Sequence, residues 1–567
     1  MPTLATLLSQ AFPEKQEYIL SRLSEQLRSG KDQVLSSPSV APLTLYSTYP
    51  DGFEENGNRN LTTLTNKLSY IRDLGCNAIH ILPFFPSPLV DGGFDIANYT
   101  QIRADLGTMD DFEHMLQKAS TLNMKVFIDL ACNHVSQKHS WFEQAQAGET
   151  PYKDFFIVSE KTPILLAIED GVAHYDIAGK QMSATIIFPE QAGKLPHWIK
   201  GSDERWYFHT FYPHQIDLNW NNPDVFIAIA QVIEFWSGKG VNLRLDAAPH
   251  LDKNLQRRIE KNTPRNHLII ELLRGVQLLT NPQSLLIAEV VDGFSEISSY
   301  THSPNLVQSD YVYNFFTLNG LWTALATGDG SELLSSLAML EKSDFASWIN
   351  FLRSHDALML GFVDEEAVKS THEVLINKGR SFGKGLEIAG RLASFLDNNS
   401  QDIVFAHFLL ASLPGSIALF YGDEVGKSNT PEYVDQEVWR KRHLTEQESI
   451  APDQRDLGRG IIHTSEYYSN KGQYLYKSIQ EMLEARSLHF STNMNGIQVL
   501  ATPDSFVIAF THLTQPQITV YANPAHEFAR VPFKREGQVV FNCNQTLVEA
   551  HELLLPPRSG VWVQAKP

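Results

Sequence analysis

Four short apolar segments of this chain each lead into polar side chains that could carry out chemistry. These side chains are four carboxylates, two histidines and one arginine: Asp129, His134, Arg244, Asp246, Glu289, His355 and Asp356. Each polar group follows or ends a hydrophobic run of the kind that forms a buried parallel strand. Parallel strands in a barrel gather their carboxyl ends at one face, where active sites form. We therefore expect these side chains to meet in one axial pocket.

Carboxylates grouped in this way can hydrolyse a glycosidic bond. One must be ionised to attack the anomeric carbon, and another must stay protonated near neutral pH to supply the leaving oxygen. Arg244 lies two residues before Asp246, so both side chains project from the same face of a strand. We expect the guanidinium to hold Asp246 ionised and aimed at the sugar.

The elements that must position these groups alternate between apolar runs and longer helical segments, which is typical of βα units around a parallel sheet. The strands are predicted at 43–49, 77–85, 125–131, 241–247, 285–291, 349–355 and 417–422, with another near 311–318. Helix-start signals lie between them, at Asn60, at Thr108 with Asp111, and at Asn222 with Pro223. The predicted fold is α/β, a closed (β/α)₈ TIM barrel. A doubly wound sheet would need a glycine-rich nucleotide turn, which the sequence lacks.

The barrel is predicted to carry additional segments. Residues 1–40 read as an N-terminal helical segment of one or two helices. The barrel is assigned to 41–134 and 216–492. The stretch 135–215 is far too long for an ordinary loop, so we expect an inserted subdomain after the third strand. Short strands broken by Pro, Asn and Gly predict a small antiparallel β-sandwich domain over 493–567.

The composition excludes several classes of function. The 567 residues carry 46 Lys and Arg against 65 Asp and Glu, a net charge of −19 that disfavours nucleic acid as a partner. Three scattered cysteines, Cys76, Cys132 and Cys543, form no disulfide or metal pattern. Neither a signal peptide nor a membrane span is found. We expect a cytoplasmic monomer or homodimer that binds a small sugar.

The motifs DLACNH, RLDAAPH, AEVV and RSHD, in this order, resemble the four conserved blocks of the α-amylase superfamily, glycoside hydrolase family 13. The resemblance implies Asp246 as nucleophile, Glu289 as general acid/base and Asp356 as transition-state stabiliser. It further implies that His134, Arg244 and His355 bind glucose in the subsite next to the scissile bond, that Asp129 is structural, and that Asn133 matches a position that ligates calcium in some members. Here neither a metal nor a cofactor is expected.

A second similarity narrows the substrate. ILPFFPSPLVDGGFDIANY resembles sucrose phosphorylases, glucosylglycerate phosphorylases and trehalose synthases, which act on small α-glucosides. It implies that Asp91 and Phe94 hold the terminal glucose, with Phe94 stacked on the ring. Asp91 would pair with an arginine of RDLGRG, best placed at Arg459 and less well at Arg455. Closure of the pocket by this pair predicts exo action on one glucosyl unit.

Three functions are compared. A retaining α-glucosidase or transglucosylase is favoured, because AEVV and YGDEVGKSN look like the hydrolases and isomerases. A glucoside phosphorylase is the alternative, with phosphate as co-substrate, although the sequence shows no clustered basic residues for it. A non-catalytic binding protein is disfavoured because all three catalytic carboxylates are present. Pro249 replaces a lysine common in amylases, so the identity of the leaving group is not predicted.

Overall fold

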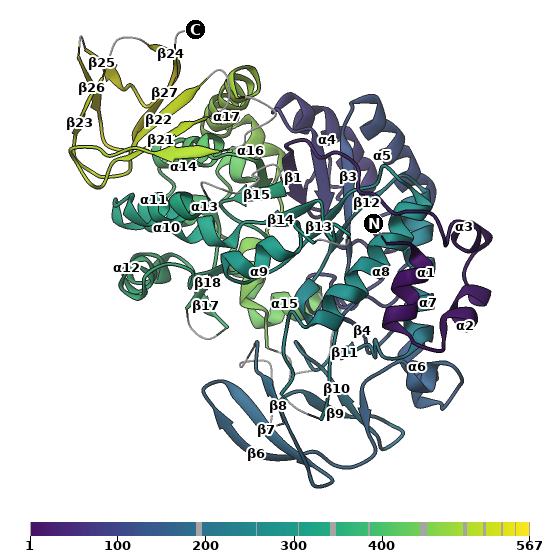
Figure 1. Cartoon of the computed structure of the whole chain (residues 1–567). Helices are drawn as coiled ribbons and strands as arrows, with labels where there is room; N and C mark the ends of the chain where they lie inside the picture. Colours follow the sequence, from purple (N-terminus) through teal and green to yellow (C-terminus); the bar gives the residue numbers. More distant parts are fainter. Residues whose placement is uncertain are drawn as a thin grey trace.

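The computed structural model describes the chain except for residues 1, 189–194, 257, 304–305, 341–346, 384–385, 443–450, 491–495, 514–516, 534–536, 550 and 566–567, and except for the side chains of 440–442. At its centre is a closed barrel of eight parallel strands, with the neighbour order β1-β19-β15-β14-β13-β12-β3-β2 (Figure 1). The strands are β1 (Thr44–Thr48), β2 (Ala78–Ile81), β3 (Lys125–Leu130), β12 (Asn242–Leu245), β13 (Leu286–Ala288), β14 (Tyr311–Tyr313), β15 (Trp348–Phe351) and β19 (Ser416–Phe420). All eight predicted strands are thus present, and the predicted barrel is confirmed.

The register of the barrel strands brings polar residues side by side in its interior. Ser47 of β1 lies opposite His80 of β2, and Arg244 of β12 lies opposite Asp129 of β3. The other strand residues are mostly buried and apolar, as expected for strands covered on both faces. The polar groups therefore form one connected set inside a hydrophobic barrel.

Helices surround the barrel and begin at the predicted capping residues. Asn60 accepts a hydrogen bond from the amide of Thr63, and Thr108 and Asp111 form a capping box. The longer helices are α4 (Leu61–Asp73), α5 (Met109–Thr121), α7 (Pro223–Gly238), α8 (Pro264–Thr280), α10 (Phe315–Thr327), α11 (Ser331–Leu340), α12 (Glu365–Leu375), α14 (Ser400–Ser412) and α17 (Asn470–His489). Shorter helices are α9 (Phe294–Ser299), α13 (Leu392–Phe395), α15 (Gln436–Arg442) and α16 (Thr464–Tyr468).

The N-terminal segment contains three short helices, where one or two were predicted. They are α1 (Leu4–Ala11), α2 (Gln16–Arg22) and α3 (Glu25–Ser29). Pro13 cannot continue α1, and Ser24 caps a new helix by accepting a hydrogen bond from Leu27. The helices lie against α7 and α8, where Tyr18 donates to Asp224 over 2.6 Å.

The long connection between β3 and α7 forms small antiparallel sheets. Its elements are β4 (His134–Ser136), α6 (Ser140–Gln146), β5 (Val158–Ser159), β6 (Ile164–Glu169), β7 (Val172–Ile177), β8 (Lys180–Thr185), β9 (Trp198–Lys200), β10 (Trp206–Phe208) and β11 (Gln215–Asp217). β11 pairs with β4, so that Asp217 lies opposite His134 and the two ends of the connection meet beside the barrel. Strands β6 to β8 extend away from the barrel at the bottom of Figure 1.

The C-terminal residues form two antiparallel sheets at the opposite side of the barrel from β6 to β8 (Figure 1). One sheet contains β20 (Ile497–Val499), β21 (Ile508–His512), β22 (Ile518–Asn523), β27 (Ser559–Ala565) and β24 (Gly537–Cys543). The other contains β23 (Ala529–Pro532), β26 (Glu552–Leu555) and β25 (Leu547–Val548). The predicted antiparallel sheets are confirmed. The predicted boundary at 492/493 lies outside the described residues.

Candidate active site

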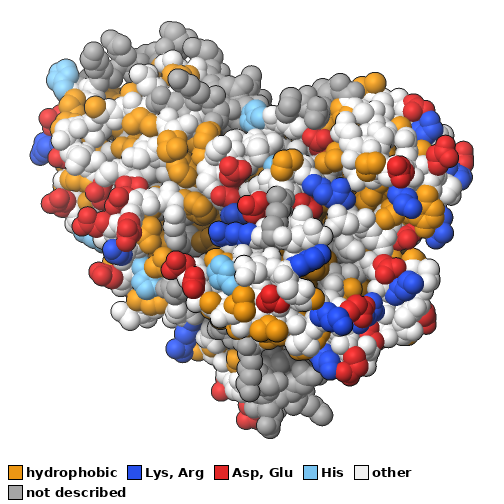
Figure 2. Space-filling model, turned by 60° about the horizontal axis from the view of Figure 1, so that its bottom comes forward, with side chains coloured by type: hydrophobic (Ala, Val, Ile, Leu, Met, Phe, Trp, Pro, Cys, Tyr) orange, Lys and Arg blue, Asp and Glu red, His pale blue; other side chains and the backbone are white. Residues whose placement is uncertain are grey.

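A cavity of about 970 Å³ lies where the barrel strands end and the long connection begins. It is large enough for a disaccharide-sized ligand. Most residues predicted for the site line it, namely Asp91, Phe94, His134, Asp246, Glu289, His355 and Asp356. On the face turned forward in Figure 2, Lys and Arg side chains are interspersed with Asp and Glu.

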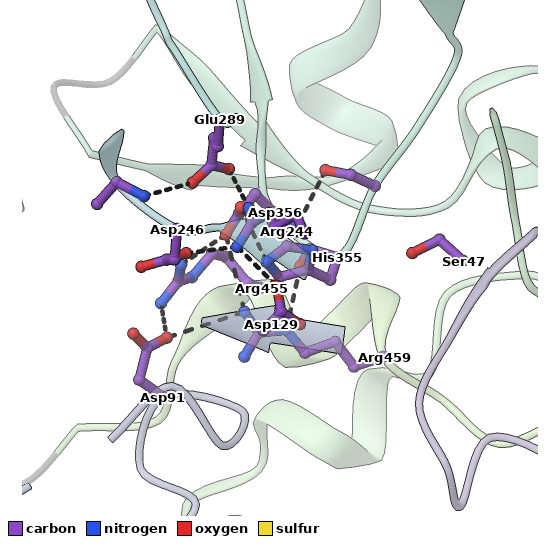
Figure 3. A network of polar contacts seen from close by, with 12 residues as sticks. Ser47, Asp91, Asp129, Arg244, Asp246, Glu289, His355, Asp356, Arg455 and Arg459 are labelled. Carbon is purple, nitrogen blue, oxygen red and sulfur yellow. Dashed lines mark hydrogen bonds and ion pairs between the residues drawn. The ribbon is translucent and has the colours of Figure 1, made fainter. Parts of the chain in front are cut away.

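Arg244 connects the carboxylates at the base of the cavity. Its Nη1 lies 2.9 Å from Asp129 Oδ1 and 2.5 Å from Asp246 Oδ1, and its Nη2 lies 2.6 Å from Glu289 Oε1 (Figure 3). The side chain is almost completely buried. Because the guanidinium is a rigid planar fork, the carboxyl groups of Asp246 and Glu289 are held next to each other.

Backbone geometry adds a second contact between these two positions. Ala247, directly after Asp246, has a left-handed conformation with φ +48°, which is costly for a residue with a Cβ. This conformation lets its amide donate to Glu289 Oε2 over 3.2 Å. The strained residue therefore orients one carboxyl group against the other.

The two carboxyl groups have raised pKa values. Burial is the main cause for Asp246, whose pKa is raised to about 6 even though Arg244 favours its ionised form. Burial also raises the pKa of Glu289, to about 7, with further contributions from Asp246 and Asp356. Glu289 therefore retains a proton to higher pH than Asp246.

Asp356 is ionised by its surroundings. Burial disfavours its charge, but His355 Nε2 lies 3.1 Å from Oδ2 and Arg455 Nη1 lies 2.7 Å from Oδ1. The His355 imidazole and the Arg455 guanidinium hold the pKa of Asp356 well below its usual value. The three carboxyl groups in this cavity thus have different pKa values.

Asp91 and Arg455, which both line the cavity, form an ion pair. Arg455 Nη2 also contacts Tyr212 and Asp453, at 2.8 and 2.6 Å. The prediction that Arg459 is the better partner is wrong, because its Nη2 is 4.0 Å from Asp91 Oδ1 and it does not line the cavity.

The helical turn that precedes Arg459 explains why Arg455 is the partner of Asp91. Asp453 caps the 3₁₀ helix η8 (Gln454–Gly458), accepts from the amide of Arg455 and so directs its side chain into the site. Arg459 follows the turn and donates to Asp456 and to the carbonyl of His355. Arg459 therefore contacts the backbone of His355 and does not line the cavity itself.

The remaining predicted residues form one wall of the cavity. The rings of Phe94 and His355 are stacked with centroids 4.9 Å apart, and Arg244 lies over the Phe94 ring. His134 Nε2 is 3.3 Å from the carbonyl of Phe94. Burial lowers the pKa of His134, so it acts as a neutral hydrogen-bonding group.

A buried hydrogen-bond chain that sequence reasoning missed leads to Arg244. Ser47 Oγ lies 3.1 Å from His80 Nδ1, and His80 Nε2 lies 3.1 Å from Asp129 Oδ2. The available signal was a single histidine inside the apolar run NAIHILPFF.

The comparison with family models decides the classification. Residues 47–373 match the model described as "Alpha amylase, catalytic domain". The chain belongs to the α-amylase family.

Three known proteins resemble the chain over 37% to 82% of its length. The trehalose synthase/amylase of Mycolicibacterium smegmatis is 31% identical over 486 residues, covering 82% of this chain and 77% of that protein. The corresponding protein of Mycobacterium tuberculosis is 31% identical over 377 residues, which span only 59% of its length. The trehalose-6-phosphate hydrolase of Escherichia coli is 34% identical over 214 residues, which are 37% of this chain and 36% of that protein.

Solved structures share the fold. A trehalulose synthase in complex with Tris superposes with a TM-score of 0.70 at 16% identity, covering 92% of this chain and 99% of that one. A trehalose-6-phosphate hydrolase of Bacillus licheniformis gives 0.68 at 19% identity, covering 94% and 100%. Among the described residues, no helix is both long and apolar enough to span a membrane, and no cluster of three or more His, Cys, Asp or Glu side chains could hold a metal ion.

Proposed function

We propose that this α-amylase-family protein is a retaining, exo-acting α-glucosidase or transglucosylase of small α-glucosides, of the sucrose, trehalose or glucosylglycerol type. The observation that carries the proposal is the pairing of Asp246 and Glu289 on the two nitrogens of Arg244. A retaining glycosidase needs its two carboxyl groups close together, at about 5 Å. The relatives named for trehalose and trehalose 6-phosphate support a small glucoside as substrate.

In the first step, Asp246 attacks the anomeric carbon and the bond to the leaving oxygen breaks. Arg244 holds Asp246 ionised, while Glu289, with a pKa of about 7, supplies the proton that the leaving oxygen takes up. Asp356 remains negative and stabilises the oxocarbenium-like charge on the sugar. The products are a glucosyl ester on Asp246 and the free aglycone.

In the second step, a hydroxyl group attacks the glucosyl ester. Glu289, now ionised, takes the proton of the attacking water or sugar hydroxyl, and the bond between the glucose and Asp246 breaks. Two inversions at the anomeric carbon return the α configuration. Water gives hydrolysis and a sugar hydroxyl gives transfer on the same residues.

The ion pair of Asp91 with Arg455 supports exo action. Both residues line the cavity, and we expect their ion pair to close it behind the position where Phe94 would stack on the glucose ring. A chain of sugars could not extend past this pair, so a single terminal glucosyl unit fits. We expect Asp91 and Arg455 to bond the hydroxyl groups at the closed end of that unit.

Product analysis with a panel of small α-glucosides tests the proposal. Incubations with and without inorganic phosphate should give glucose or a new glucoside in both cases, and NMR of the first product should show the α anomer. Mass spectrometry of a Glu289→Gln variant reacted with α-glucosyl fluoride should find the added glucosyl unit on Asp246. Glucose 1-phosphate as the main product would make the protein a phosphorylase, and a β anomer would refute the retaining mechanism.

A further inference from the structure

A buried lysine lies between the barrel and the long connection after β3. Lys253 follows the 3₁₀ turn η3 (Ala248–His250), and its side chain is only 1% exposed. Its ammonium donates to Asn133 Oδ1 and to the carbonyl oxygen of His250, and it lies 2.9 Å from Asp217 Oδ2. A buried ammonium in this position is stable only because all three oxygens face it.

The three oxygens come from three separate parts of the fold. Asn133 follows β3, Asp217 ends the long connection in β11, and His250 ends the turn that follows β12. Asp217 is fixed further by the amide of Thr210, 3.0 Å from Oδ1. Lys253, which follows β12, therefore joins both ends of the connection to the barrel, through its contacts with Asn133 and Asp217.

The donor set is one that usually binds a hard cation. An amide oxygen, a carboxylate and a backbone carbonyl are typical calcium ligands, and Asn133 corresponds to a calcium position in some α-amylase relatives. The residues of this chain do not fit a metal there, because the ammonium of Lys253 already occupies the space between the oxygens. A divalent ion would have to share them with a second positive charge.

We propose that Lys253 is a built-in cation that replaces a calcium ion and makes the architecture of this site independent of divalent metals. Through Asn133 and His250 it positions neighbours that line the cavity, since His134 follows Asn133 directly and His250 is itself part of the wall. Lys253 itself is among the lining residues, but its side chain is almost completely buried and its ammonium contacts Asn133, His250 and Asp217, so it is a positioning residue. The proposal concerns metal dependence and holds whichever glucoside is the substrate.

The wild-type protein provides the first test. After dialysis against EDTA, its melting temperature should be unchanged, and calorimetric titration with calcium chloride should detect no binding. A loss of melting temperature on EDTA treatment that calcium restores would overturn the proposal. Neither readout depends on activity, so they separate this inference from the proposed function.

Two substitutions provide the second test. Lys253→Ala should lower the melting temperature by about 5–10 °C, because it leaves the buried Asp217 carboxylate without its charged partner. Added calcium should then bind between the freed oxygens and raise the melting temperature, as does any ligand specific for the folded state. Lys253→Met fills the space with an apolar chain, so it should be destabilised and should not respond to calcium.

Lys200→Ala is the matched control, because Lys200 forms an exposed ion pair with Glu204 in the same connection. It should change neither the melting temperature nor the calcium response. A Lys253→Met variant as stable as the wild type would overturn the proposal, as would a folded Lys253→Ala variant that does not bind calcium. If Lys253→Ala does not fold, the EDTA experiment and Lys253→Met still decide between the outcomes.

Discussion

Replacing Arg455 by alanine should damage the site far more than the same change at Arg459. Arg455 Nη1 lies 2.7 Å from Asp356 Oδ1, whereas the nearest atom of Arg459 is 3.9 Å away. At an effective dielectric constant of about 20, the two attractions differ by about 2 kcal/mol. Arg455 also donates charged hydrogen bonds to both Asp91 and Asp356, and such bonds contribute about 1.5–3 kcal/mol. A loss of about 3–5 kcal/mol corresponds to a fall in kcat/KM of about 10²- to 10⁴-fold.

The assay measures kcat/KM on the preferred glucoside for Arg455→Ala, Arg455→Lys and Arg459→Ala, with the melting temperature of each protein as a check on folding. Lysine keeps the charge but cannot bridge two carboxylates with a fork, so Arg455→Lys should be intermediate. Arg459→Ala should lose at least 10-fold less kcat/KM than Arg455→Ala. If Arg459→Ala were the more damaging of the two in folded protein, the assignment of Arg455 to the closed end would be refuted.

Three further predictions concern the same cavity. The profile of kcat/KM against pH should be bell-shaped, with a maximum between about pH 6 and 7. Asp246, of pKa about 6, must be ionised, and Glu289, of pKa about 7, must be protonated. A profile still rising above pH 8 would contradict these roles. Replacement of His80 by leucine should lower kcat by about 10-fold and move the acidic limb of the pH profile to higher pH, because Asp129, having lost its bond to His80, would compete with Asp246 for Arg244. His80→Asn should keep more activity. An unshifted acidic limb would exclude an effect of His80 on Asp246 through Asp129 and Arg244. Replacement of Phe94 by leucine should raise KM by about 2- to 10-fold with little change in kcat, since aromatic stacking contributes about 0.5–1.5 kcal/mol; an unchanged KM would place the glucose elsewhere.

The barrel could be predicted because its signals are local. Each strand is a short apolar run, and the helices start at capping residues such as Asn60 and Thr108 whose hydrogen bonds the structure contains. Asp246 and Glu289 could be placed because each follows such a run directly. The alternation of side chains along a strand then fixed Arg244 on the same side as Asp246.

Contacts that depend on three-dimensional packing could not be predicted in this way. The choice between Arg455 and Arg459 depends on how the cap at Asp453 orients Arg455, the second residue of η8. The residues next to Lys253 in the sequence do not indicate that its partners are Asn133 and Asp217, which are 120 and 36 positions away. Such long-range polar contacts leave no periodic pattern, because each involves one side chain at a loop or strand end.

In the proposed mechanism, the charges around Arg244 would let the carboxyl group of Glu289 serve first as an acid and then as a base. Arg244 faces Asp129, Asp246 and Glu289, but Asp129 is also bonded to His80. In the resting site, ionised Asp246 compensates most of the positive charge of Arg244 that Asp129 leaves. A second negative charge on Glu289 is therefore unfavourable, and Glu289 keeps its proton. Once Asp246 becomes a neutral glucosyl ester, Arg244 can stabilise ionised Glu289 instead. In the proposed mechanism, the base needed for the second step is thus produced by the chemistry of the first, without movement of the arginine.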